Sequence, residues 1–495
     1  MSIEEGSTRR AHRAFVVDAF FYIPIQVAPA LVSLASVPIL TRLVSLDQYG
    51  VYVLATAVAT TAATLATSWI GNAIVRFLPV EKESDNRQKV SGAIVVLSGA
   101  SQLPIFGLLA VSWFVWPSMF VHRTSLVFAA MAFFVATAAT NIVRSVLVGR
   151  RLIQLNMWFT LLTAVIGPLF GLGLVASGFG GIEGMLWGSS IIAAVSSAVI
   201  WLLAEGRSLV VDADATRRFG ALSLQYGLPL LFSLVAFGML ETSDRYIIAL
   251  YHGGQAVAVY SASYGLASRA VAFLASLYLT ASYPVAMRAF DSEGLDAAQR
   301  ILPYFTRVFL LFGVPMVVGL SLLAKPVLEM LLERQYIDGY RVIPFVAFAW
   351  FLSGLSTSFQ LPLSFLNRNG VLLWSTIVAA LLQIGLNFVF VPRFGYLAAA
   401  VTTLLSYACF LTILATVSRR FATWKFPFAA AIRICVATTI MALSVIAWIF
   451  GAPLGRPAVV VFGGVGLGAS AYLASLILLG EVTTVELRQL FIRPV

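Results

Sequence analysis

The sequence predicts an all-α polytopic membrane protein with fourteen transmembrane helices, or twelve at the fewest. Of its 495 residues, 60% are hydrophobic and only 11% are charged, whereas a soluble globular domain has about 45–50% and about 25%. The mean hydropathy is +0.94, and apolar residues are spread along nearly the whole chain rather than gathered on one face of each element. This composition excludes most soluble enzymes and indicates that lipid surrounds most of the chain.

Each predicted span is a run of about 20 mostly apolar residues, the length that crosses a bilayer as a helix. The first run follows Arg9, Arg10 and Arg13, and it is too long for the apolar region of a signal peptide, which has about 7–15 residues. The stretches 155–203 and 370–417 are each counted as two spans, but each could be misjudged as one long hairpin. The range is therefore twelve to fourteen spans. The predicted spans are 15–41, 48–72, 90–114, 125–148, 155–177, 182–203, 224–250, 256–283, 303–324, 342–366, 370–391, 395–417, 428–450 and 457–479.

The basic residues predict the orientation. With the amino terminus inside, the connections on the cytoplasmic side hold about three times as many Lys and Arg residues as those on the other side, as the positive-inside rule requires. The net charge of +11 therefore reflects membrane topology, and we expect no nucleic-acid partner. An even number of spans places both termini in the cytoplasm.

Motifs for catalysis, metal binding or nucleotide binding are absent from the sequence. Cys409 and Cys435 lie inside apolar segments, and the three histidines are far apart, so neither a disulfide framework nor a metal site is indicated. The phosphate-loop pattern G-x-x-x-x-G-K-[ST] does not occur. We therefore expect no cofactor and no metal, and any energy source would be the substrate gradient or an ion such as H⁺ or Na⁺.

An internal repeat predicts two bundles. Leu46 to Tyr52 resembles Gly254 to Tyr260, and Arg151 to Trp158 resembles Asn367 to Trp374 about 216 residues later. Each half holds six spans, so the halves run the same way through the membrane and are related by a pseudo-two-fold axis along its normal. The predicted organisation is an amino-terminal six-helix bundle at 1–203, a cytoplasmic linker at 204–223, a carboxy-terminal six-helix bundle at 224–417, and two appended helices with a tail at 418–495.

Charged residues inside the predicted spans of the second half are the first candidates for function. A charge at the bilayer centre costs about 2.5–3.5 kcal/mol on insertion scales, so such residues usually face a partner or a polar cavity. Arg269 lies about 13 residues into its span, which is about 20 Å of helix. Glu241, Asp244 and Arg245 share one helical face, and Glu241 and Arg245 can pair at i and i+4.

The first half offers weaker candidates. Asp18, Arg42 and Arg76 lie in or at the ends of the first two spans. The arginines could instead extend to the lipid headgroups, and Asp18 could be an acid favoured by the helix dipole. We assign Arg269, Arg245, Arg76 and Arg42 as candidate substrate-binding cations, and Glu241, Asp244 and Asp18 as candidate ion-coupling carboxylates.

Several segments together resemble the polysaccharide flippase (Wzx-like) branch of the multidrug/oligosaccharidyl-lipid/polysaccharide (MOP) exporter superfamily. They are PILTRLVSLDQYGVY at 38–52, AIVRFLP at 73–79, DRYII at 244–248 and AVY at 258–260. The sequence departs from the family where Ala256 to Ala258 replaces a frequent Val-Gly pair before the tyrosine. The resemblance covers spans one to twelve and implies a MATE/MOP-like fold.

This resemblance implies a flippase of the bacterial inner membrane that carries an undecaprenyl-pyrophosphate-linked oligosaccharide from the inner to the outer leaflet. Such a transporter serves exopolysaccharide, capsule or O-antigen (lipopolysaccharide) biosynthesis, with a polysaccharide polymerase or export machinery as a partner. Guanidinium groups suit pyrophosphate because they form charge-assisted, often bidentate contacts with its oxygens. The implied mechanism is alternating access by rocking of the two bundles.

Two other functions remain open. A multidrug or organic-cation antiporter of the same superfamily would need carboxylates in its cavity, whereas the deep groups here are balanced or basic. A membrane glycosyltransferase or polysaccharide polymerase would need catalytic acids on a sizeable outer loop. The longest outer connection, Lys325 to Arg341, carries Glu329, Glu333 and Asp338 together with basic residues. We therefore expect a transporter rather than an enzyme.

Overall fold

A computed structural model describes residues 27–80, 84–115, 123–206, 209–451 and 456–481 of the chain. The described residues are almost entirely helical and include no strand. The candidate carboxylate Asp18 lies outside them. The chain divides into two compact units, Met1–Gly238 and Met239–Val495.

The first unit begins with an apolar helix, Val27–Leu43. Ser45 then caps the next helix by accepting a hydrogen bond from the Gln48 amide, while the Gln48 side chain accepts one from the Ser45 amide, a reciprocal arrangement that satisfies two of the free amides at a helix start. The helices that follow are α2 (Leu46–Phe77), the 3₁₀ turn η1 (Leu78–Val80), α3 (Ser84–Ala100), α4 (Leu103–Val115), α6 (Thr124–Gly149), α7 (Ile153–Leu161), the π-helical turn η2 (Leu162–Ile166), α8 (Gly167–Ala176) and α9 (Gly181–Glu205).

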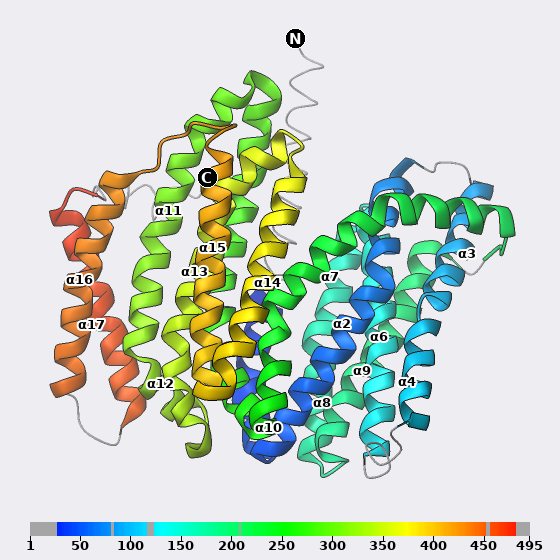
Figure 1. The fold of residues 1–495 in the computed structure, drawn as a ribbon, viewed down its shortest axis with the longest axis horizontal. Coiled ribbons are helices and arrows are strands. Elements are labelled where there is room, and N and C mark those ends of the chain that lie inside the picture. Colours follow the sequence, from blue (N-terminus) through cyan, green and yellow to red (C-terminus); the bar gives the residue numbers. More distant parts are fainter. Residues whose placement is uncertain (1–26, 81–83, 116–122, 207–208, 452–455, 482–495) are drawn as a thin grey trace. The chain divides into compact units, whose positions relative to one another are not determined.

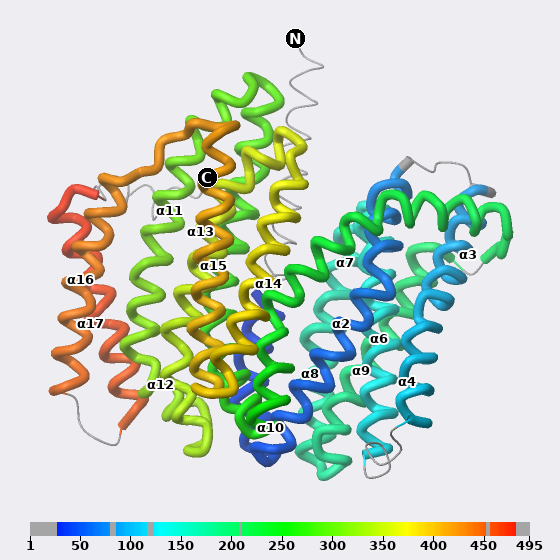
Figure 2. The backbone as a smooth tube through the Cα atoms, viewed as in Figure 1, coloured from blue at the N-terminus to red at the C-terminus, as the bar shows by residue number. Residues whose placement is uncertain are grey.

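A single long helix, α10 (Ala213–Glu293), begins in the first unit and continues into the second. The remaining helices belong to the second unit, and their path can be followed in Figures 1 and 2. They are α11 (Leu295–Leu322), α12 (Ala324–Leu331), the 3₁₀ segment η3 (Arg334–Arg341), α13 (Val342–Phe365), α14 (Asn369–Phe394), α15 (Tyr396–Ser418), α16 (Phe428–Gly451) and α17 (Pro457–Leu478).

The structure confirms the predicted membrane class and is consistent with fourteen spans. Twelve described helices are long and apolar enough to cross a membrane. One of them, α10, contains two predicted spans, 224–250 and 256–283, and the shorter helix Val27–Leu43 accounts for the first. The predicted connections were wrong in detail, because 213–222 and most of 284–302 continue the helices instead of forming loops. Polar residues there do not prevent helix formation once the backbone is already helical on one side.

Glycine produces sharp turns at two of the expected connections, the one between spans 224–250 and 256–283 and the one at 284–302. Gly253 interrupts α10 with φ 77° and ψ −177°, and Gly294 separates α10 from α11 with φ 83° and ψ −169°. This backbone region is essentially confined to glycine because a Cβ atom clashes there. One residue therefore reverses the chain where the sequence pattern predicted a connection of several.

Corresponding positions of the predicted repeat have the same local structure. Arg151 (φ 57°) and Asn367 (φ 55°) are the non-glycine residues with positive φ in the described part of the chain, and they are 216 positions apart. In the first unit α9 packs on α6 and α8. In the second, α15 packs on α13 and α14 in the same order along the chain. The similarity was therefore present in backbone turns and helix packing as well as in the short sequence matches.

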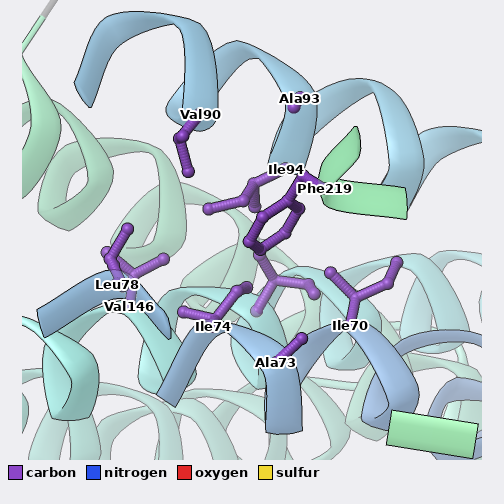
Figure 3. Close-up of a cluster of buried hydrophobic side chains, with 10 residues drawn as sticks. Ile70, Ala73, Ile74, Leu78, Val90, Ala93, Ile94, Val146 and Phe219 are labelled. Carbon is purple, nitrogen blue, oxygen red and sulfur yellow. The ribbon is translucent and has the colours of Figure 1, made fainter. Parts of the chain in front are cut away.

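An apolar cluster fixes the start of α10 on the first unit. Phe219 lies among Ile70 and Ile74 of α2, Leu78 of η1, and Val90 and Ile94 of α3 (Figure 3). Farther along α10, a Cβ on Gly227 would come within 1.9 Å of the Trp69 carbonyl oxygen, so only glycine permits this approach. The portion of α10 before Gly238 is thus a built-in part of the first unit rather than a free linker.

Each unit also contains a buried glutamate that holds two arginines. Glu205, at the end of α9, receives hydrogen bonds from Arg150 (Nε to Oε1, 2.8 Å) and Arg87 (Nε to Oε2, 3.2 Å). Glu481, just after α17, pairs with Arg307 of α11 (2.5 Å) and Arg433 of α16 (3.2 Å). Both glutamate side chains are only 2% exposed. The Glu481 pairs hold the end of α17 against α11 and α16. Figure 1 shows α16 and α17 beside α11.

Candidate functional site

The charged residues predicted in span seven lie on α10 just before its break at Gly253. Asp244 is fully buried, and Glu241 and Arg245 are partly buried. The break turns the chain so that Tyr260 and Tyr264, after Gly253, meet the residues before it. We call the set Glu241, Asp244, Arg245, Tyr260, Tyr264, Trp350 and Tyr407 the Asp244 cluster, and all of its members belong to the second unit.

Asp244 is held from two directions. The fully buried Tyr260 donates its hydroxyl hydrogen to Oδ2 of Asp244. The backbone N–H of Arg245 donates to Oδ1 over 2.8 Å. A buried carboxylate needs such donors because an unsatisfied one loses its hydration without compensation. The carboxyl group is therefore fixed in orientation by groups on both sides of the Gly253 break.

Arg245 is positioned by a ring and a carbonyl group. Its guanidinium carbon lies 4.8 Å from the centre of the Tyr264 ring, within the range of a cation–π interaction. One of its terminal nitrogens donates to the backbone carbonyl oxygen of Glu241 over 2.9 Å. The expected side-chain pair between Glu241 and Arg245 is not formed, because the guanidinium reaches the carbonyl oxygen one turn back on the helix before it reaches the carboxylate.

Aromatic residues complete the Asp244 cluster. Trp350 of α13 donates its indole N–H to the Tyr264 hydroxyl oxygen over 3.1 Å, and the rings of Tyr260 and Tyr264 are 5.5 Å apart. Tyr407 of α15 lies beside Trp350, with 6.1 Å between ring centres. Its buried hydroxyl has no hydrogen-bond partner among the described residues.

Charge alone could not identify these aromatic groups. Tyr260 was noticed in the sequence only as part of a repeated segment, although its place 16 residues after Asp244 is a usable signal once a reversal at Gly253 is considered. Trp350 and Tyr407 lie 106 and 163 residues beyond Asp244 in the sequence, and nothing in their local pattern links them to α10. Their proximity comes from tertiary packing of α13 and α15.

Arg269 lies 16 residues after Gly253 on α10, which is about 24 Å of helix, and it is partly buried. Its guanidinium carbon lies 3.7 Å from the point that a Cβ on Gly265 would occupy. The side chain therefore extends back along its own helix over Gly265, in the direction that long side chains take on a helix. Arg269 is thus far from either end of this helical stretch, which continues to Glu293.

The structure does not bring Arg42 and Arg76 together. Arg42 precedes α2 and Arg76 lies in its last turn, so about 45 Å of helix lies between them. Both side chains are exposed. They belong to the first unit, whereas Arg245 and Arg269 belong to the second, and their role in substrate binding stays a prediction.

The Asp244 cluster combines two acids, one base and three phenols inside a helix bundle. Such groups are rare in membrane spans and commonly mark the path of a substrate or ion. In the described residues, no group of three or more His, Cys, Asp or Glu side chains is placed to hold a metal ion. The arrangement offers a fixed carboxylate, a fixed cation and hydroxyl groups that can exchange hydrogen bonds.

The fold is that of transporters of the MOP superfamily. A structure described as the lipid II flippase MurJ in an inward closed conformation matches with a TM-score of 0.74 at 14% identity, covering 97% of this chain and 100% of that one. A multidrug resistance MATE family transporter of the MOP superfamily, in an inward-facing conformation, matches with a TM-score of 0.60 at 14% identity, covering 80% of this chain and 97% of that one. None of the curated proteins matches the sequence.

The family model described as polysaccharide biosynthesis protein matches residues 39–341, more than half of the sequence. The chain therefore belongs to the polysaccharide biosynthesis protein family. The two solved structures that share its fold are described as a flippase and a transporter.

Proposed function

We propose that the protein is a flippase for a lipid-linked oligosaccharide. Its substrate would be an undecaprenyl-pyrophosphate-linked polysaccharide repeat unit, carried from the inner to the outer leaflet of the bacterial inner membrane for exopolysaccharide, capsule or O-antigen assembly. Both termini would lie in the cytoplasm, and a polysaccharide polymerase would use the product. MurJ, whose fold this chain shares, is described as a lipid II flippase.

The observation that carries the proposal is the position of Arg269. A partly buried guanidinium in the middle of a long apolar helix is rare, and such groups commonly mark the path of a substrate or ion. Pyrophosphate is such a partner, since guanidinium binds phosphate oxygens through charge-assisted hydrogen bonds. Membership in the polysaccharide biosynthesis protein family agrees with a glycan attached to that pyrophosphate.

The proposed mechanism is alternating access without ATP. The two bundles would rock so that the substrate head faces first one side of the membrane and then the other, while the lipid tail stays in the bilayer. Asp244, Glu241 and Asp18 are the carboxylates proposed to couple this movement to H⁺ or Na⁺. Asp244 is the best supported of the three, because its two hydrogen bonds come from both sides of the Gly253 break.

Reconstitution tests the proposal. The full chain is placed in liposomes that contain a fluorescent polyprenyl-pyrophosphate-linked glycan, and leaflet exchange is measured by quenching of the outer leaflet. Arg269→Ala should abolish exchange, and Arg269→Lys should retain part of it because one positive charge remains. Arg300→Ala is the matched control, since Arg300 is 67% exposed and pairs with Glu293 at the surface.

The outcomes separate the alternatives. Full exchange by Arg269→Ala would remove that residue from the site. A wild-type chain that inserts and folds but exchanges no lipid-linked glycan would contradict the flippase function itself.

Organic-cation antiport is the second candidate, and one observation favours it. The buried carboxylate of Asp244 is the kind of group that binds cations, and the MATE structure with the same fold is described as a multidrug resistance transporter. In the same liposomes, release of a fluorescent organic cation driven by a proton or sodium gradient would support antiport. Release that Asp244→Asn abolishes while glycan exchange is absent in the wild type would replace the flippase proposal.

A further inference from the structure

A second group of cations lies at one end of the second unit, away from the Asp244 cluster. Arg368 precedes α14, and Arg419, Arg420 and Lys425 lie in the connection between α15 and α16. All four side chains are exposed. We call these four residues the basic rim.

The two segments of the basic rim are in contact and well fixed. The Arg368 guanidinium lies 5.2 Å from the centre of the Phe421 ring, which joins the α13–α14 turn to the connection after α15. The Thr423 amide donates to the Gln299 side chain of α11 over 3.1 Å. The rim is therefore preformed, and a ligand would not have to order it.

A row of aromatic rings seats this connection on the helix bundle. The Trp424 ring lies 5.2 Å from that of Phe359 on α13 and 6.2 Å from that of Phe426, which in turn is 4.8 Å from Phe428. Phe428 remains 63% exposed. Aromatic rings beside basic residues are typical of the level at which lipid headgroups meet the acyl chains.

Among the described residues the basic rim has no carboxylate partner, and this distinguishes it from Arg300, Arg307 and Arg433 of the same unit. Glu481 pairs with Arg307 and Arg433, and Glu293 pairs with Arg300. No ion pair involves the four rim residues in the described part of the chain. The connection 419–428, with the sequence RRFATWKFPF, contains no acidic residue.

Comparison of the two halves of the internal repeat shows that the missing acidic residue is a feature of the second unit. The corresponding helix end in the first unit carries Glu205, which pairs with Arg87 and Arg150. The spacing of 215 residues that relates Phe179-Gly180 to Phe394-Gly395 places Arg420 at the position of Glu205. The first unit thus neutralises its own arginines at this end, whereas the second unit presents a further cation.

The start of α14 adds to the positive potential of the rim. No side chain caps this 26-residue helix at Arg368, and the Val371 amide donates to the Arg368 carbonyl oxygen over 3.0 Å, so the amides ahead of Val371 are the ones that can meet an anion. The helix dipole favours a negative charge at that point. Two independent features, unpaired cations and an uncapped helix start, therefore favour the same ligand charge.

We propose that the basic rim is a binding site for the phosphate headgroup of an anionic phospholipid, with the acyl chains lying along the aromatic rings at Phe428. Phosphatidylglycerol is the simplest lipid with this chemistry. The site does not depend on the transported substrate, so it can be tested whether or not the flippase proposal holds.

The chain supplies a matched control for this proposal. The tripeptide Arg-Arg-Phe occurs at 217–219 as well as at 419–421, and both arginines are exposed in each case. The first copy, however, lies within a few residues of Asp212 and Asp214. Replacing either pair of arginines by glutamine removes two positive charges. A difference in lipid binding between the two variants therefore reports the residues around each pair.

The experiment measures phosphatidylglycerol binding to the purified full chain in nonionic detergent by native mass spectrometry, with phosphatidylcholine as the neutral lipid. Arg419→Gln with Arg420→Gln should weaken phosphatidylglycerol binding about 30-fold, because each basic residue contributes about fivefold at an anionic surface. Arg419→Lys with Arg420→Lys should retain binding within about threefold, because the charge is kept. Arg217→Gln with Arg218→Gln should change it less than about threefold, since neighbouring acids already offset that charge.

Three results would overturn the assignment. They are equal losses in the two glutamine variants, equal binding of phosphatidylcholine by the wild type, and full displacement of the lipid by an equal concentration of inorganic pyrophosphate. The last would indicate a site for a soluble anion. Thermal unfolding of the lysine and glutamine variants, followed by tryptophan fluorescence, must match the wild type, which separates lost binding from lost folding.

Discussion

Tyr260 donates a hydrogen bond to Asp244 across a reversal of the chain at Gly253, although both residues belong to the same long helix, α10. Sixteen residues of unbroken helix would hold the two side chains about 24 Å apart. A single glycine therefore converts a distant pair into the central contact of the Asp244 cluster. Replacing Tyr260, Asp244 or Gly253 should therefore disturb the Asp244 cluster in each case.

Tyr260→Phe should lower the free energy of unfolding by about 1.5–3 kcal/mol, the usual contribution of a hydrogen bond to a charged group. The phenylalanine ring fills the same space, so little packing is lost. Thermal unfolding in detergent measures the effect. Asp244→Asn is the matched partner, and the double variant should be less destabilised than the sum of the two single variants, because both remove one shared contact. Fully additive losses would show that the two residues act separately.

Gly253→Ala should destabilise the protein by about 1–3 kcal/mol through backbone strain. A Cβ at this position meets no atom within 4 Å, so crowding cannot contribute. Gly385→Ala is the control: it is helical and equally uncrowded, and alanine should be neutral or slightly stabilising there. Equal unfolding temperatures for the two variants would mean that the turn at Gly253 tolerates a side chain.

Glu205→Gln should lower the free energy of unfolding of the first unit by about 2–4 kcal/mol. Arg150 is 11% exposed and binds the carboxylate through two nitrogens, over 2.8 and 3.1 Å, and removing one partner of a buried pair leaves its charge uncompensated. The half-exposed Arg87 makes the loss smaller than for a fully buried triad. Urea or thermal unfolding provides the measurement.

Glu293→Gln is the control for that substitution. Glu293 and Arg300 are 66% and 67% exposed, and solvent screens such pairs almost completely. The unfolding temperature should hardly move. A loss as large as that of Glu205→Gln would show that exposure does not decide the contribution of these ion pairs.

Acid should loosen the start of α10. The amide of Ala215 donates to Asp212 over 2.8 Å and lowers the pKa of that carboxyl below its ordinary value, and Lys89, 3.9 Å away, acts in the same direction. Because the pKa is lower in the folded chain, the stabilisation is present above the unfolded pKa of about 3.9 and is lost as the pH falls through the folded pKa. The protection factors for hydrogen exchange of residues 213–219 should fall below about pH 4. Asp212→Asn should remove this pH dependence, and an unchanged acid response would contradict the assignment.

The sequence was sufficient to predict the helices but not their ends. Hydropathy locates the buried part of each helix, since lipid requires about 20 apolar residues. It does not report where the helix ends, and thus 213–222 and 284–302 appeared to be loops. Gly253 and Gly294 were not identified as reversals, because glycine is common in membrane helices and its φ angle leaves no periodic pattern.

The charged residues of the candidate site could be predicted from the sequence, but the aromatic residues that contact them could not. Asp244 and Arg245 were identified because charge is rare in apolar spans. Tyr260, Tyr264 and Trp350 were not predicted as partners of these charges, since aromatic residues are usually part of the apolar surface. The same limit applied to Glu205 and Glu481, which were not predicted to hold the arginines packed against them.

The pairing of Arg307 with Glu481 has a consequence for biosynthesis. The two residues are 174 positions apart, and the ribosome makes the arginine first. During translation α11 enters the bilayer carrying a cation whose acid has not yet been synthesised, and Arg433 arrives in the same condition. The charges of Arg307 and Arg433 can thus be balanced by this acid only once Glu481 has been synthesised, and a nascent chain that stops short of Glu481 carries both guanidinium groups without it.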